Sequence, residues 1–331
     1  MKTLIAVLTL CIAACQRAPA NHTSPSPVVS ASTTDGPSPR SGAGLAYDSR
    51  RSKLVLFGGS DTGFKPLGDT WEWSKNRWTR VAADAPARGN FAMAYDSWRG
   101  RVVVFGGSTA TGKSHDTWEF DGLRWTQVDT GGPPARNLMS MAFDEKRGRM
   151  VMFGGAGTRQ GLGDTWEWDG TSWRAMPAGD PGPAARGSHT LVYDANRQRV
   201  VLVGGFVNSA VADSWEWDGA TWARVADGPL VLHHAAAYDP RSKRLLVFGG
   251  FVGDKRTANL WARDGTSWNQ LTGDGPPARA EHRGAYVPGL GFVIFGGIGG
   301  TGMSVEERGR SKLSDLWAFD GVRWQELSPG R

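Results

Sequence analysis

The chain has 331 residues and a net charge of +6, and its 38 lysines and arginines are scattered along the sequence. A nucleic-acid footprint needs a clustered basic patch, so we interpret this charge as a solvated surface and expect no nucleic-acid partner. Glycine (46) and tryptophan (16) are frequent and long charged helical stretches are missing, a composition typical of short strands and tight turns.

Residues 1–15 predict a signal peptide, because a basic start precedes an apolar run too short to span a membrane as a mature helix. The run ends in Ile12-Ala13-Ala14-Cys15, which resembles the lipobox of bacterial lipoproteins. The resemblance implies cleavage before Cys15 and lipidation of that residue, and Gln16 in place of Asp favours the outer membrane. An ordinary secretory signal is the alternative. In either case we expect an exported protein.

Residues 16–39 are rich in Ser, Thr, Pro and Ala, and we predict a flexible tether there. The two cysteines are Cys11 and Cys15, so the mature fold would hold no disulfide. No other apolar stretch approaches 18 residues, and we therefore expect membrane contact through the lipid anchor only.

Residues 40–331 are predicted to form one repeat domain. A short apolar run ends in a glycine pair six times, and the first glycines are 48, 48, 50, 45 and 47 residues apart. These pairs are Gly58-Gly59, Gly106-Gly107, Gly154-Gly155, Gly204-Gly205, Gly249-Gly250 and Gly296-Gly297. Such a period suits a four-stranded propeller blade.

The second repeat shows the expected strands, at 91–96, 101–105, 117–121 and 123–128. The second of these is continuously apolar, as expected for a strand buried on both faces, and the third alternates aromatic and polar residues. Fifteen of the 16 tryptophans occupy repeat positions and Trp98 is the exception. We interpret the fifteen as packing between blades rather than as platforms for sugars.

The apolar run with Gly-Gly, an aromatic residue about a dozen positions later and a tryptophan five positions beyond it resemble kelch repeats. The resemblance implies an all-β fold, a six-bladed β-propeller with four antiparallel strands in each blade, similar to the central domain of galactose oxidase. Arg263 departs from the pattern at the aromatic position of the fifth unit. The repeats also begin on a first strand and end on a fourth, so the blade that many kelch propellers share between their termini is not evident.

The connections that lead into the first strands carry the candidate ligand-binding residues. The arginines are Arg40, Arg88, Arg136, Arg186 and Arg279, and the histidines three positions after such a site are His189, His234 and His282. The fifth unit has Val231 in place of arginine. Two interpretations stay open: the arginines could grip an anionic ligand at the channel mouth, or each could bond the blade backbone and close its own repeat.

The sixth unit carries a long loop within Ile298–Leu313, on the same predicted face. Long loops on a rigid scaffold often carry function, and an unused insertion is the alternative. In this unit Arg279, Glu281 and His282 form the best local group for acid–base chemistry, although neighbouring strand residues point to opposite faces.

We expect a monomeric, lipid-anchored binding module for a protein, a glycan or another anionic polymer, without metal or cofactor. The alternative is a carbohydrate-active enzyme, since bacterial sialic-acid mutarotases are kelch propellers; Arg279, Glu281 and His282 would then be catalytic. The copper chemistry of galactose oxidase needs a cross-linked cysteine, and no cysteine follows Cys15.

Overall fold

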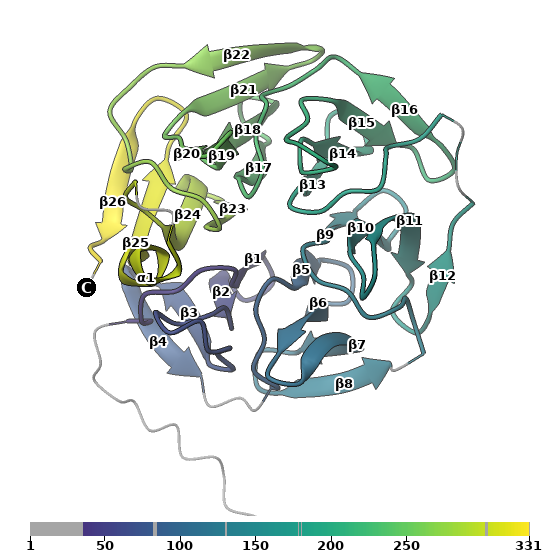
Figure 1. The fold of residues 1–331 in the computed structure, drawn as a ribbon, viewed down its shortest axis with the longest axis horizontal. Coiled ribbons are helices and arrows are strands. Elements are labelled where there is room, and N and C mark those ends of the chain that lie inside the picture. The colour runs from purple at the N-terminus through teal and green to yellow at the C-terminus, as the bar shows by residue number, and fades with distance from the viewer. Residues whose placement is uncertain are drawn as a thin grey trace, which may run out of the picture.

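The computed structural model describes residues 36–81, 85–129, 131–177, 179, 181–301 and 304–330. Six four-stranded antiparallel sheets stand as blades around a central channel (Figure 1). This confirms the predicted all-β, six-bladed propeller. The predicted signal peptide with Cys15, and residues 16–35 of the predicted tether, lie outside the described residues.

The strands of each blade follow one another in the chain. Blade 1 holds β1 (Gly44–Asp48), β2 (Lys53–Phe57), β3 (Thr70–Ser74) and β4 (Arg77–Val81); blade 2 holds β5 (Ala92–Asp96), β6 (Arg101–Thr109), β7 (Gly112–Phe120) and β8 (Trp125–Asp129). Blade 3 holds β9 (Ser140–Asp144), β10 (Arg149–Ala156), β11 (Gly161–Trp168) and β12 (Trp173–Ala175); blade 4 holds β13 (Thr190–Asp194), β14 (Arg199–Val203), β15 (Ser214–Trp217) and β16 (Trp222–Val225). Blade 5 holds β17 (Ala235–Asp239), β18 (Arg244–Phe248), β21 (Leu260–Asp264) and β22 (Ser267–Leu271), with a small hairpin of β19 (Phe251–Val252) and β20 (Lys255–Arg256). Blade 6 holds β23 (Arg283–Val287), β24 (Gly291–Ile298), β25 (Lys312–Phe319) and β26 (Trp324–Ser328), and the helix α1 (Val305–Arg310) lies in its long loop.

The glycine pairs join neighbouring blades. Both glycines of the first pair have positive φ, 61° at Gly58 and 98° at Gly59, and a Cβ at Gly58 would lie 2.7 Å from the carbonyl oxygen of Arg88 in the next blade. The Gly59 amide donates to that same carbonyl at 2.9 Å, and the equivalent bond recurs at all six boundaries. The pair therefore lets two backbones approach closely enough to bond, which a side chain would prevent.

The glycine pairs do not end the second strand in every blade. The second strand was expected to end at the glycines, but β6, β10 and β24 continue through them. The register shifts at that point, between Phe105 and Gly107 in β6. In blades 2, 3 and 6 the pair is thus a β-bulge inside the second strand. One extra residue shifts the register, and pairing with the third strand resumes beyond the pair.

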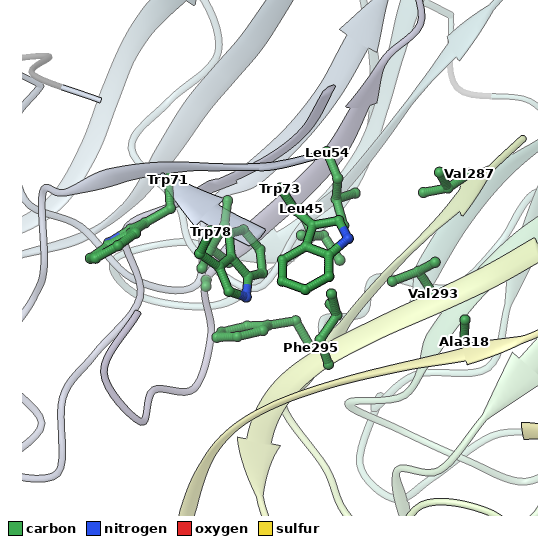
Figure 2. Close-up of a cluster of buried hydrophobic side chains, with 12 residues drawn as sticks. Leu45, Leu54, Trp71, Trp73, Trp78, Val287, Val293, Phe295 and Ala318 are labelled. Carbon is green, nitrogen blue, oxygen red and sulfur yellow. The ribbon is translucent and has the colours of Figure 1, made fainter. Parts of the chain in front are cut away.

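The propeller closes without a shared blade: blade 6 packs directly on blade 1, and we call this contact the closing boundary. Leu45, Leu54 and Trp73 of blade 1 face Val287, Val293 and Phe295 of blade 6 in one buried cluster (Figure 2). The Gly297 amide donates to the carbonyl of Arg40 at 2.9 Å, the same bond that joins the other blades. Repeat-equivalent contacts thus close the ring.

The tryptophans pack between blades, as predicted from their register. Trp125 donates its indole N–H to Thr70 of the preceding blade at 2.9 Å, and Trp173 and Trp222 make the equivalent bonds to Thr117 and Thr165. Each ring buries apolar area while its N–H finds an acceptor in the neighbouring blade. The exception noted in the sequence, Trp98, is 59% exposed.

Candidate functional site

The five predicted arginines lie buried inside their own blades, with exposed fractions of 0–2%. Arg88 shows the common pattern: Nη1 and Nη2 donate to both carboxylate oxygens of Asp116 at 2.8 and 3.0 Å, Nη1 also donates to the Gly106 carbonyl, and Nε to that of Pro86. Arg40, Arg136, Arg186 and Arg279 repeat it with Asp69, Asp164, Asp213 and Asp315. This geometry favours the interpretation that each arginine closes its own repeat.

This pairing lowers the pKa of four of these aspartates, which are Asp69, Asp116, Asp164 and Asp213. Burial opposes ionisation, but Arg88 and hydrogen bonds from Ser114 and Trp118 lower the pKa of Asp116 to about 2. The fifth unit lacks both partners, with Val231 at the arginine position and Asn259 at the aspartate position. This joint replacement was a visible sign in the sequence that the two residues pair, and it was missed.

The three predicted histidines are buried and packed at blade boundaries. His189 lies edge-on against Phe153, and His282 lies edge-on against Phe248 and bonds its carbonyl through Nε2 at 3.1 Å. His234 bonds Thr190 through Nε2 at 2.8 Å. Burial lowers the pKa of His189 and of His234 to about 3 and that of His282 well below its usual value. All three are therefore neutral near pH 7 and supply no positive charge to an anion.

The structure does not bring the predicted acid–base group together. Arg279 binds Asp315, His282 binds a backbone carbonyl, and Glu281 forms an ion pair with Arg308 of α1. Burial raises the pKa of Glu281, but the charges of His233 and Arg308 outweigh it and lower that pKa overall. Glu281 is thus an ionised, paired carboxylate at the channel mouth, and the catalytic role of the three residues stays a prediction.

A closed ring of backbone hydrogen bonds forms this mouth. The six residues two positions after each arginine site have left-handed backbone: Gly42, Asn90, Leu138, Ser188, His233 and Glu281, with φ between 54° and 62°. Each donates its amide to the carbonyl of the ring residue of the preceding blade, at 2.8–3.0 Å, and the Gly42–Glu281 bond closes the circle. The backbone is uniform around the mouth while the side chains differ from blade to blade.

The long loop of blade 6 is partly helical and reaches this ring. Ser304 and Glu307 form a capping box at the start of α1, which stabilises so short a helix. Arg308 pairs with Glu281 of the ring, and a Cβ at Gly309 would lie 2.5 Å from the carbonyl oxygen of Thr62 in blade 1. In Figure 1, α1 lies on the side where blades 6 and 1 meet. The insertion is therefore docked on the channel mouth.

Three basic residues at one repeat position tie neighbouring loops together on this face. Lys113 donates to the Ala156 carbonyl at 3.1 Å, Arg256 to that of Gly300 at 2.8 Å, and Lys312 to that of Ser60 at 3.0 Å. Burial lowers the pKa of Lys312 to about 8. Much of the positive charge on this face therefore serves to hold the blades.

Arg283 is a further charged group of the mouth, and no sequence motif pointed to it. It begins β23 and lines a cavity of about 130 Å³ in the channel, together with Ser140 and Thr190. Its Nη1 donates to the His282 carbonyl at 3.2 Å. The other blades carry Gly44, Ala92, Ser140, Thr190 and Ala235 at the equivalent position, so the guanidinium adds charge to an otherwise neutral wall.

Other kinds of site receive no support within the described residues. They contain no group of three or more His, Cys, Asp or Glu side chains placed to hold a metal ion. No helix among them is long and apolar enough to cross a membrane.

Comparison with known proteins gives two likenesses. The family model of the KLHDC2/KLHL20/DRC7 Kelch-repeats domain matches residues 22–205. The alpha chain of the flagellar outer-arm dynein from Chlamydomonas reinhardtii is 36% identical over 111 residues, which cover 31% of this chain and 2% of that protein. The chain thus spans a small part of this curated relative.

Proposed function

The chain belongs to the kelch-repeat β-propeller family, and on this premise we propose that it is an interaction module that binds a protein partner at the mouth carrying α1. One observation carries the proposal: six equivalent ring positions share one backbone conformation but hold six different residues, with a helix docked beside them. A rigid scaffold with variable residues at one face is the usual arrangement of a binding surface.

We propose further that the partner presents an acidic group to this mouth. Arg283 faces the channel cavity, and Arg308 stands beside Glu281 within the ring. A guanidinium in a partly dehydrated site recognises carboxylates through paired hydrogen bonds. The buried arginines Arg40, Arg88, Arg136, Arg186 and Arg279 would support this surface from below, through their own blades, instead of touching the ligand.

Selection from a random peptide library on the intact protein tests this site. Acid-rich peptides should be enriched, and Arg283→Ala should reduce their affinity at least tenfold. Arg244→Ala, at a half-buried position that begins β18, should leave it unchanged. Equal enrichment of basic and acidic peptides, or full binding by the Arg283 variant, would contradict the proposal. Turnover of an acidic sugar that is lost in Glu281→Gln would instead support the mutarotase alternative.

We also propose that the protein is exported and lipid-anchored at Cys15, on the lipobox-like sequence alone. Metabolic labelling with a radioactive fatty acid in a bacterial host should mark the wild-type chain. The Cys15→Ala variant should stay unlabelled and leave the membrane fraction. Labelling that survives this substitution would refute the anchor and leave the propeller site untouched.

A further inference from the structure

A second surface differs between blades, on the face of the hairpin turns, opposite α1. At the boundary of blades 3 and 4, Trp217 donates its indole N–H to Glu167 of the preceding blade at 2.9 Å. At the boundary of blades 2 and 3, Trp168 donates to Glu119 at 3.3 Å. Arg263 occupies the same position in blade 5 and donates to Glu216 at 2.8 Å, so a carboxylate meets the N–H donor in each case.

The tyrosines of the first strands also meet a carboxylate across the blade boundary. The hydroxyl of Tyr95 lies beside Asp48 of the preceding blade and accepts from the Arg50 amide at 3.2 Å. Tyr238 lies beside Asp194 in the same way, and Tyr286 beside Asp239. Each of these tyrosine hydroxyls therefore has an acidic neighbour in the preceding blade.

The boundary of blades 5 and 6 has neither a donor nor an acceptor at the third-strand position. Its third-strand position is Phe319, which has no N–H, and the position equivalent to the glutamate is Ala262. This boundary has lost both groups, whereas Glu72 is kept opposite Phe120 at the boundary of blades 1 and 2, where it pairs with Arg51. Loss of both partners leaves no unsatisfied group, so this pairing costs little.

At the closing boundary the donors have no acidic neighbour in the preceding blade. Blade 1 keeps both donors, Tyr47 and Trp73, but blade 6 has Val287 and Ala318 at the acidic positions. The Tyr47 hydroxyl and the Trp73 indole N–H therefore meet no carboxylate of blade 6, and both residues line a groove at this boundary. Figure 2 shows Trp73 facing apolar side chains of blade 6.

A groove of about 530 Å³ lies at this place, a volume that suits a small organic ligand. Leu54, Val287 and Leu290 give it apolar walls, and Lys53 and Lys75 add positive charge. The residues that line it include no aspartate or glutamate. The groove therefore combines two aromatic donors, cations and apolar surface, and lacks a carboxylate.

We propose that this groove binds a small monocarboxylate with an apolar body. The ligand's carboxylate takes the place of the missing glutamate and accepts from Trp73 and Tyr47, while Lys53 or Lys75 balances its charge. Its apolar body lies on Leu54 and the side chains of blade 6. Charge-assisted bonds to these two donors supply specificity, because a hydrogen bond to an ionised carboxylate is stronger than one to a neutral acceptor.

Titration calorimetry with 2-naphthoate, and with the neutral 2-naphthamide as the matched compound, tests the charge requirement. The naphthoate should bind at least tenfold more tightly than the amide. Tyr47→Phe and Trp73→Phe should each weaken naphthoate binding about fivefold or more. Trp217→Phe removes an equivalent donor elsewhere and should leave it unchanged. Equal affinity for the two compounds would overturn the proposal.

The second test introduces a glutamate at the position where blade 6 lacks one. It does not require the removal of a buried ring. Ala318→Glu should abolish naphthoate binding and raise the thermal midpoint, since the chain then supplies its own acceptor. Ala262→Glu places the same group opposite Phe319 and should lower the midpoint while leaving binding intact. Unchanged naphthoate affinity in Ala318→Glu would refute the site. Peptide binding at the α1 mouth should be unaffected by all these variants, which separates the two proposals.

Discussion

The boundary of blades 3 and 4, which we call the polar boundary, and the closing boundary contain the same aromatic pair. Phe153 packs on Trp222 with ring centroids 5.4 Å apart and planes at 71°, and Phe295 packs on Trp78 with the same two values. The polar groups around the pair differ. Trp222 donates to Thr165, whereas the Trp78 N–H has no acceptor in the described chain, because Leu316 stands at the threonine position.

The same contrast extends to the charged groups. At the polar boundary Asp144 and Glu167 bind Arg147 at 2.7 and 2.6 Å, and Glu167 also accepts from Trp217. The closing boundary has Val287 and Ala318 instead of those acids. Apolar packing and the backbone bonds common to every boundary therefore join blades 6 and 1 without this carboxylate network.

The largest expected effect concerns the phenylalanine–tryptophan pair that both boundaries contain. Phe153→Ala and Phe295→Ala should each lower the free energy of unfolding by about 3–5 kcal/mol, since each removes a buried ring and leaves a cavity. Denaturant titration of both variants measures this. If one variant loses less than half as much free energy of unfolding as the other, the two aromatic pairs contribute unequally to stability despite their equal geometry.

The next effect tests the polar network alone. Glu167→Gln should cost about 2–3 kcal/mol, because Arg147 and the neighbouring carboxylate keep their positions while the paired charge is lost. Glu145→Gln, an exposed site in the same blade, is the control and should change stability by less than about 0.5 kcal/mol. Equal losses in the two variants would mean that the network contributes nothing beyond surface charge.

A smaller difference isolates one hydrogen bond. Trp222→Phe removes an indole N–H with an acceptor, and Trp78→Phe removes one without. The first should be more destabilising than the second by about 1 kcal/mol, the usual net contribution of one hydrogen bond. Thermal melts of the two variants measure the difference. A greater loss of stability in Trp78→Phe would contradict the interpretation that the Trp78 N–H makes no stabilising hydrogen bond.

The smallest effect at neutral pH concerns His189, which packs against Phe153 at the polar boundary. Burial lowers its pKa to about 3, so between the unfolded value near 6.5 and pH 3 the unfolded chain binds more protons. Stability should therefore fall as the pH drops through that window. His189→Met, which copies Met139 of blade 3, should flatten the slope, and exposed His115→Gln should not.

Much of the fold followed from periodicity. Six glycine pairs and tryptophans in register predict six blades, because only a repeat that stacks on copies of itself buries such rings. The closing boundary was less predictable, since it depends on which residues from the two ends of the chain meet. That Leu316 faces Trp78 is a relation between blades far apart in sequence.

The candidate site was predicted less well, for a physical reason. A conserved position within the repeat, such as Arg88, marks what every blade needs, and the structure places it in the blade interior. The groups at the mouth are those that one blade has and the others lack, such as Arg283 and Arg308. The repeats reveal the scaffold that all blades share. Recognition depends on residues that occur in one blade alone, and the sequence does not specify the direction of their side chains.

The ring of six backbone bonds has a consequence for electrostatics at the channel mouth. Every amide of the ring points tangentially to its neighbour, so the six peptide dipoles circulate and their in-plane components cancel. None of these N–H groups is left to converge on a bound anion, as amides do in a phosphate-binding loop. Charge selectivity at this mouth is therefore carried by side chains, and it can be exchanged by substitution without altering the backbone that holds the propeller closed.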